Sequence, residues 1–388
     1  MCKMFKKCQF LLGIHLNDFV FSNQVKISSR ESLGIDSQSI VVLYVGRLSF
    51  HAKAHPFQMY KALESAVNTT GKNLVLIECG WAANDYIRNA FSEAAREICP
   101  SVRVINLDGR VAKEREQAWS SADIFCSLSD NIQETFGIVP LEGMAAGLPV
   151  VVSDWNGYKD TVSDGVEGFR VPTIAPEAGL GGDLAYRHAI GIDTYDKYCG
   201  FNSTFVGLNI EVLAEIFCRL VEDKNLRLSM GASGREKIKS RYDWSHVIKI
   251  YEDFWQDLED RRKGGKNKEN LKNLQPKYLD PFQAFSHYPT QNLDLEISLS
   301  LINSDKSAAI QLVEEYRKMT LINYVSELLP SPETVSALLR LLFARSCNMH
   351  HRDRRCIANT FASQTPSARR PLLCVCLHYN QGRLAAFQ

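Results

Sequence analysis

Short apolar runs alternate with segments of helical spacing along this chain from residue 41 onward. The runs occupy residues 41–45, 74–79, 102–107, 123–128 and 150–153, and glycines close the first two of them. Buried apolar strands that alternate with helices favour a parallel sheet with right-handed crossovers and helices on both faces. The sequence therefore predicts an α/β fold with a doubly wound parallel sheet, whose ligands lie beyond the carboxyl ends of the strands.

Two acidic residues, Glu134 and Glu142, flank a loop that opens a helix just before the last of these strands. Gly147 can end that helix in a left-handed conformation, and Pro149 stands at the start of the strand, where a missing N–H costs least. The free N–H groups of a helix N-terminus favour phosphate. Two carboxylates beside a phosphate site suggest a hydroxyl-rich sugar, so the pattern points to a nucleotide sugar.

Motifs in a fixed order resemble those of the family 4 retaining glycosyltransferases of the GT-B fold. They are Gly46-Arg47 with Lys53, then Glu134 and Glu142 with the strand 149–154, then the segments 154–162 and 164–168, and finally Tyr242-Asp243-Trp244 with Tyr251 and Trp255. The resemblance covers about residues 30 to 260. Any one of these motifs alone is weak, but the ordered set is specific.

The resemblance implies the Rossmann-like donor domain of a hexosyltransferase-like enzyme that uses a UDP-, GDP- or ADP-sugar, transfers it with retention and needs no cofactor. Arg47 and Lys53 would neutralise the departing diphosphate without a metal, since a guanidinium fork and an ammonium both suit phosphate oxygens. Glu134 would contact the donor sugar, and with Arg47 and Lys53 it forms the expected catalytic set.

The other expected donor-binding residues follow from the same resemblance. Glu142 would hydrogen-bond the ribose hydroxyls, and residues 109–111, at the end of the third run, would approach the base. Backbone N–H groups at the helix start would meet the phosphates, where a glycine allows close approach. These remaining donor-binding residues are Val111, Thr135, Phe136, Gly137 and Ile138.

Plainer interpretations of these residues compete with the donor site. Arg47 and Lys53 can be solvated loop cations. The helix dipole alone favours an acid at its N-terminus by about 0.3–1 kcal/mol, which explains Glu134 but not Glu142 further into the helix. A glycoside hydrolase with two catalytic acids does not need the two cations. A nicotinamide dehydrogenase is a poor fit, because residues 46–49 lack Gly-x-Gly-x-x-Gly.

Composition argues against other classes of partner. The 45 Lys and Arg residues against 44 Asp and Glu give no electrostatic case for nucleic acid or a membrane surface. The 11 cysteines show no disulfide framework in the body of the chain, which is typical of a cytoplasmic protein. The apolar run 10–14 is too short for a signal peptide, and nothing reaches the length of a membrane span.

The expected domain organisation is uneven. We interpret residues 1–30 as a remnant linker from an absent acceptor domain, 31–260 as the nucleotide-sugar-binding domain, 261–275 as a linker, 276–346 as a helical extension, and 347–388 as a basic, disordered tail. Between residues 173 and 208 we expect a long loop, either a lid or a partly disordered segment. The Cys and His spacing of the tail matches no standard zinc finger, so no metal is expected.

The missing acceptor half leaves two function classes open. The first is an active glycosyltransferase, with a separate chain binding an acceptor that is a glycan, a lipid or a small molecule. The second is a non-catalytic or truncated module that only binds a nucleotide sugar. Aromatic residues of the last helix of the domain, such as Trp244 and Trp255, would lose part of their cover, which suggests a partner surface, a repacked tail or a truncated chain.

Overall fold

The computed structural model describes residues 12–264, 280–293, 299–300, 306–324, 326–337 and 386–387. Its centre is a six-stranded sheet in which every neighbouring pair is parallel, in the order β3-β2-β1-β4-β5-β6. The strands are β1 (Ile40–Val45), β2 (Leu74–Gly80), β3 (Arg103–Asp108), β4 (Ile124–Ser127), β5 (Val150–Ser153) and β6 (Gly168–Val171). The prediction of a doubly wound parallel sheet is confirmed.

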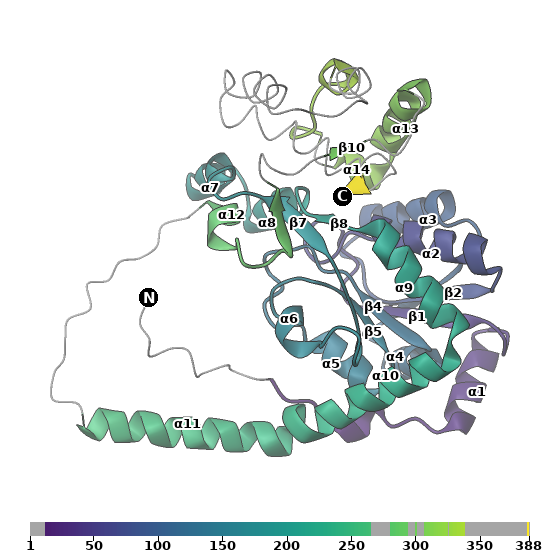
Figure 1. The fold of residues 1–388 in the computed structure, drawn as a ribbon, viewed down its shortest axis with the longest axis vertical. Coiled ribbons are helices and arrows are strands. Elements are labelled where there is room, and N and C mark those ends of the chain that lie inside the picture. Colours follow the sequence, from purple (N-terminus) through teal and green to yellow (C-terminus); the bar gives the residue numbers. More distant parts are fainter. Residues whose placement is uncertain are drawn as a thin grey trace.

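Helices cover both faces of this sheet, because each inner strand is apolar on both sides. In β1, Val42 and Tyr44 enter one core cluster, whereas Val41 and Leu43 enter the other. The first face is covered by α2 (Phe57–Thr70), α3 (Asp85–Ile98) and α9 (Ile210–Glu222), which Figure 1 shows together beside the strands. The second face is covered by α4 (Ala112–Ser121) and α5 (Ile138–Ala145). Alternation of side chains along the strands thus builds two cores.

Ion pairs and hydrogen bonds attach a short helix before the sheet to the sheet itself. In α1 (Asn23–Ser32), Lys26 Nζ lies 2.8 Å from Oδ1 of Asp123, at the start of β4. Arg30 forms an ion pair with the other carboxylate oxygen, and its Nε donates to the carbonyl of Ser121 at 3.0 Å. The same carboxylate accepts the backbone N–H of Val41 at 2.9 Å. One acid therefore joins α1, β1 and β4.

Beyond α9, the chain continues in three helical segments, the last of which extends away from the sheet. These are α10 (Lys224–Lys237), the π-helix η3 (Ile238–Tyr242) and α11 (Trp244–Gly264), and Figure 1 shows α11 leaving the sheet as one long helix. Trp255 is 61 % exposed and Ile248 is 48 % exposed. None of the helices in the described ranges has the length and apolar character that a bilayer span requires.

Residues 173–208 are not the loop that the sequence predicts. They form β7 (Thr173–Pro176), α7 (Gly182–Ala189), α8 (Tyr195–Ser203) and β8 (Gly207–Leu208). The Arg187 guanidinium pairs with Asp193 at 2.6 Å, and the Thr194 hydroxyl caps α8. Tyr198 and Phe201 join a third apolar cluster. The glycines of this segment predict a loop, but packing against residues distant in the sequence gives it regular structure.

Part of the helical extension folds back onto the domain. It includes α12 (Pro281–Ala284), β9 (Gln291–Leu293), α13 (Lys306–Lys318) and α14 (Thr320–Asn323), with a short β10 (Leu299–Ser300) that pairs with β11 (Ala386–Phe387). β9 pairs in parallel with β7. α11 continues to Gly264, inside the expected linker. The rest of that linker, the first eleven residues, and the tail with its Cys and His residues lie outside the described residues, apart from 386–387.

Candidate active site

The loops after β1, β4 and β5 meet at the carboxyl edge of the sheet. A parallel sheet places these ends side by side, and β1, β4 and β5 are consecutive neighbours in the strand order. The Ser129 hydroxyl donates to the carbonyl of Lys53 at 3.3 Å, and the Ser153 hydroxyl donates to the carbonyl of Ser129 at 2.5 Å. The three loops are therefore bonded to one another through the residues that follow β4.

The centre of this edge is an ion pair between two expected catalytic residues. Lys53 Nζ lies 2.6 Å from Oε2 of Glu134. The whole Glu134 residue is 9 % exposed, and its backbone N–H donates to the carbonyl of Asn131 at 3.0 Å. The structure thus brings together two residues that stand far apart in the sequence.

Tyr158, in the short helix α6 (Tyr158–Thr161), is a site residue that the sequence analysis does not single out. Its hydroxyl lies 2.9 Å from Ser127 Oγ and donates to Oε2 of Glu134 at 3.5 Å. Burial, reinforced by the charge of Glu134, raises the pKa of Tyr158 well above its ordinary value, so the hydroxyl keeps its proton and acts as a donor. Its place within the motif 154–162 is the signal that could have found it.

Gly137 is required where the loop enters α5. Its φ is +79°, and a Cβ on this residue would lie 2.1 Å from Cε1 of Tyr158. No side chain caps the helix at this position. Among the described residues, the backbone N–H groups of Phe136, Gly137 and Ile138 find no hydrogen-bond acceptor. Thr135 and Ile138 are exposed, so this helix start faces solvent and can receive an anion.

Arg47 lies on the same edge, directly after β1. Its carbonyl accepts the Tyr44 hydroxyl at 3.2 Å, which fixes the backbone of the turn. The residue is half-buried, and its guanidinium forms no hydrogen bond or ion pair within the described ranges. A cation with no counter-ion among the described residues, at the sheet edge that also carries an open helix start, favours an anionic ligand.

Glu142 has different surroundings from Glu134. It lies within α5, half-buried, and burial raises its pKa to about 7, while the positive charge of Arg115 opposes this shift. Arg115 belongs to α4, on the second face of the sheet. Val111, at the start of the same helix, is 43 % exposed. The expected base and ribose contacts therefore come from the α4 side, and the expected phosphate contacts from the loops after β1 and β4.

Asp130 and Asn131 are buried polar residues of the site that the sequence analysis also misses. Asn131 Nδ2 donates to the carbonyl of His51 at 3.2 Å, and Trp155 Nε1 donates to the carbonyl of Asn131 at 3.1 Å. Asp130 is 2 % exposed, and burial raises its pKa to about 8, although backbone N–H groups, including that of His55, oppose the shift. Its Oδ1 has no hydrogen-bond partner in the described part of the chain.

No cluster of His, Cys, Asp or Glu suited to hold a metal ion occurs among the described residues. The site is instead an arrangement of two cations, one buried carboxylate and an open helix start. Such an arrangement can bind a diphosphate and stabilise negative charge that develops on it.

Known proteins resemble the part of this chain that carries the candidate site. Residues 25–178 match the family model described as "Glycosyl transferases group 1". A relative named as an uncharacterized glycosyltransferase of Methanocaldococcus jannaschii is 26 % identical over 207 residues, which cover 51 % of each chain. A D-inositol 3-phosphate glycosyltransferase of Corynebacterium glutamicum is 31 % identical over 156 residues, 39 % of this chain and 35 % of that protein. Residues 25–178 are therefore similar to the glycosyl transferase group 1 domain, and the relatives that match this chain are named as glycosyltransferases.

The chain spans about half of the first relative and about a third of the second. Among solved structures, Anabaena HepE in complex with UDP and glucose is 19 % identical, with a TM-score of 0.45 over 64 % of this chain and 55 % of that one. The match of the family model includes the loops after β1, β4 and β5.

Proposed function

We propose that this chain is a glycosyltransferase that takes a sugar from a nucleoside diphosphate donor, retains the configuration at the anomeric carbon and uses no metal. The observation that carries the proposal is the ion pair of Lys53 and Glu134 at the carboxyl edge of the sheet, where Arg47 and the open start of α5 also lie. The family match of residues 25–178 supports a transfer reaction. A nucleotide sugar supplies both the diphosphate and the hydroxyl-rich sugar that these groups suit.

In the proposed complex the diphosphate lies between the two cations and the start of α5. Arg47 offers a planar fork to two phosphate oxygens, and Lys53 adds a point charge. The N–H groups of residues 136–138 complete the cradle. Glu142 accepts the ribose hydroxyls, and Val111 and Thr135 border the nucleoside and the sugar.

The chain's part in the chemistry is to position the donor and to stabilise the leaving group. As the bond from the anomeric carbon to the phosphate oxygen breaks, negative charge grows on the diphosphate, next to Arg47 and Lys53. Glu134, already held by Lys53 and Tyr158, orients the sugar. The acceptor attacks from the face that the diphosphate leaves, which gives retention.

The second candidate is a module that binds a nucleotide sugar without transferring it. The chain covers only part of its relatives. For the first candidate we propose a glycan, a lipid or a small molecule as the acceptor, and a separate chain that binds it. Hydrolysis of the donor without an acceptor, and turnover with a panel of acceptors, would separate the two candidates.

A thermal-shift screen with UDP-, GDP- and ADP-sugars tests the donor proposal directly. We expect one nucleotide class to raise the Tm of the wild-type protein, and Lys53→Ala to lose most of that increase, because binding to the folded state alone stabilises it. Lys237→Ala is the matched control, because its ammonium pairs with Glu167, 3.1 Å away, rather than with a site residue. No increase with any donor would contradict both candidate functions.

A further inference from the structure

We infer that residues 287–290, outside the segment that matches the family model, form a clamp that holds Asn156 and through it the backbone of Glu134 in place for the donor. Asn156 is then a positioning residue of the site. This inference rests on the proposed function for its effect on the donor, but the clamp itself is a property of the unliganded chain.

Asn156 has a left-handed backbone conformation, which needs stabilising contacts in a residue with a Cβ. Its φ is +30°, and it is the one residue other than glycine with a positive φ in the described ranges. Its side-chain Nδ2 donates to the carbonyl of Glu134 at 3.0 Å and to that of Thr135 at 3.4 Å. A left-handed conformation costs about 1–2 kcal/mol for a residue with a Cβ, although less for Asn. The strained residue is thus the one that holds the Glu134 backbone.

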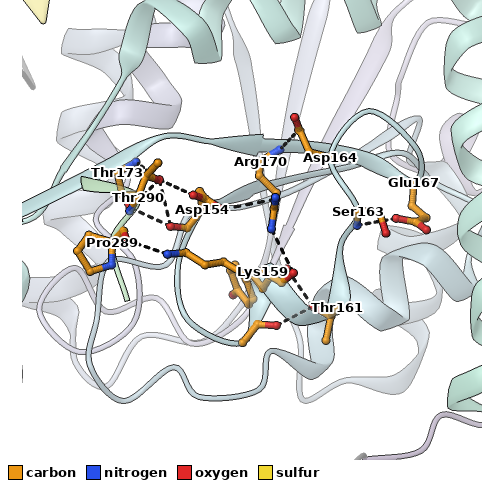
Figure 2. Close-up of polar contacts among 12 residues, drawn as sticks. Asp154, Lys159, Thr161, Ser163, Asp164, Glu167, Arg170, Thr173, Pro289 and Thr290 are labelled. Atoms are coloured by element: carbon orange, nitrogen blue, oxygen red, sulfur yellow. Dashed lines mark hydrogen bonds and ion pairs between the residues drawn. The ribbon is translucent and has the colours of Figure 1, made fainter. Parts of the chain in front are cut away.

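The clamp residues bind on both sides of Asn156. Its own N–H donates to the carbonyl of Tyr288 at 3.1 Å. Two residues before it, the carboxylate of Asp154 accepts the Thr290 hydroxyl at 2.5 Å. Three residues after it, Lys159 Nζ donates to the carbonyl of Pro289 at 2.7 Å, and Figure 2 shows both side-chain contacts in one network.

The clamp is itself anchored to the domain. Tyr288 is 4 % exposed, and its ring meets the Trp155 ring edge-on, with 5.3 Å between centroids. The backbone N–H of Thr290 donates to the hydroxyl of Thr173 at 2.9 Å, and the N–H of Thr173 donates back to the Thr290 hydroxyl at 2.9 Å (Figure 2). The next residues continue as β9, paired with β7. The clamp therefore cannot shift without breaking buried contacts.

A movement of Asn156 would directly displace residues 134–136, which belong to the loop expected to contact the donor. A Cβ on the adjacent Gly157 would lie 2.2 Å from the carbonyl oxygen of Thr135 and 2.8 Å from Cα of Phe136. The two loops are thus in backbone contact with no side chain between them. Any rotation at residues 156–157 displaces residues 134–136, which carry the expected sugar and phosphate contacts.

Hydrogen exchange on the full chain tests the clamp without a ligand. Thr290→Val removes the hydroxyl that links Asp154 and Thr173 but keeps the size of the side chain. We expect the amides of Glu134 and Asn156, which donate to the carbonyls of Asn131 and Tyr288, to exchange about tenfold faster than in the wild type, while those of β1 and β2 keep their rates. Thr70→Val is the matched control, since the Thr70 hydroxyl bonds only within its own turn at the far end of α2.

A second variant and a donor measurement complete the test. If Thr290→Val does not fold, Lys159→Met, which removes the bonds to the carbonyls of Pro289 and His287, carries the same exchange test. In either variant the Kd of the donor found in the thermal-shift screen should rise about tenfold, since a mobile loop must be ordered on binding. Unchanged exchange at Glu134 and Asn156 would overturn the clamp. Absence of donor binding by the wild type would contradict only the proposed function.

Discussion

Lys53 Nζ lies 2.6 Å from Oε2 of Glu134, although the two residues stand 81 positions apart. The carboxylate side chain is 10 % exposed, whereas that of the lysine is 32 % exposed. The ammonium therefore neutralises a nearly buried charge while one side of it still faces solvent. A diphosphate could approach that side without first uncovering the pair.

Breaking this ion pair should cost stability as well as activity. Lys53→Met leaves the Glu134 carboxylate without its counter-ion, and we expect a loss of about 1–3 kcal/mol in the free energy of unfolding at pH 7. Glu134→Gln should cost less, because a neutral amide tolerates burial better. In a urea double-mutant cycle the two losses should not add.

The exposed pair of Asp85 and Arg88 provides the control cycle, since its side chains are 82 % and 60 % exposed. Its coupling should stay below about 1 kcal/mol. Equal coupling in both cycles would mean that burial does not strengthen the pair of Lys53 and Glu134.

Alanine at Gly137 should be far more harmful than alanine at a glycine of similar backbone conformation. Gly165 has φ +75° and open space around it, whereas Gly137 has φ +79° and faces the ring of Tyr158. Gly165→Ala should therefore show only the left-handed penalty, about 1 kcal/mol, and Gly137→Ala about 3 kcal/mol or more. Thermal or urea unfolding of both variants measures the difference. Similar losses would show that the ring yields to the methyl group.

Much of the fold could be predicted because each inner strand is a continuous apolar run. The predicted run 150–153 coincides with β5, and the other four runs fall within two residues of β1, β2, β3 and β4. The apolar runs do not predict the sixth strand, Gly168–Val171, because it opens on a glycine and includes Arg170. The sequence predicts a loop at residues 173–208, because their order depends on packing with Trp155 and Phe282, which local patterns do not contain.

The candidate site was predictable to the extent that strand ends converge. Arg47, Lys53 and Glu134 each follow a strand, so the sheet brings them to one edge. Asn156 could not be assigned a role, because its conformation and its contact with Tyr288 depend on a segment more than a hundred residues away. The roles of Arg47, Lys53 and Glu134 toward a donor stay predictions.

Asp123 should make the chain sensitive to acid. Burial opposes its charge, but Lys26 and Arg30 outweigh burial and hold its pKa below the ordinary value of 3.8. Since the folded pKa is the lower one, this stability is present above pH 3.8 and is lost as the pH falls through the folded value. Asp123→Asn should lower the free energy of unfolding by about 3 kcal/mol at pH 7. It should also reduce the fall of the urea midpoint at acid pH. Asp85→Asn, at an exposed acid, should leave both unchanged.

Glu142 should link donor binding to pH near neutrality. Burial raises its pKa to about 7, against the opposing charge of Arg115. Because the folded pKa lies above the unfolded one, the group stabilises the fold most at acid pH, and this contribution falls as the pH rises through 7. Ribose hydroxyls need an ionised acceptor, so the affinity for the donor should change in the opposite direction.

We therefore expect the Kd of the donor to rise as the pH falls below 7, by up to about tenfold per pH unit, while it stays level above pH 8. Glu142→Gln should bind the donor more weakly and with no such slope, because its amide does not titrate. Arg115→Met removes the opposing positive charge and should move the onset of the slope to higher pH. Calorimetric titrations of the three proteins between pH 5.5 and pH 8.5 measure these Kd values. A slope that persists in Glu142→Gln would assign the titration to another group and remove the proposed ribose contact.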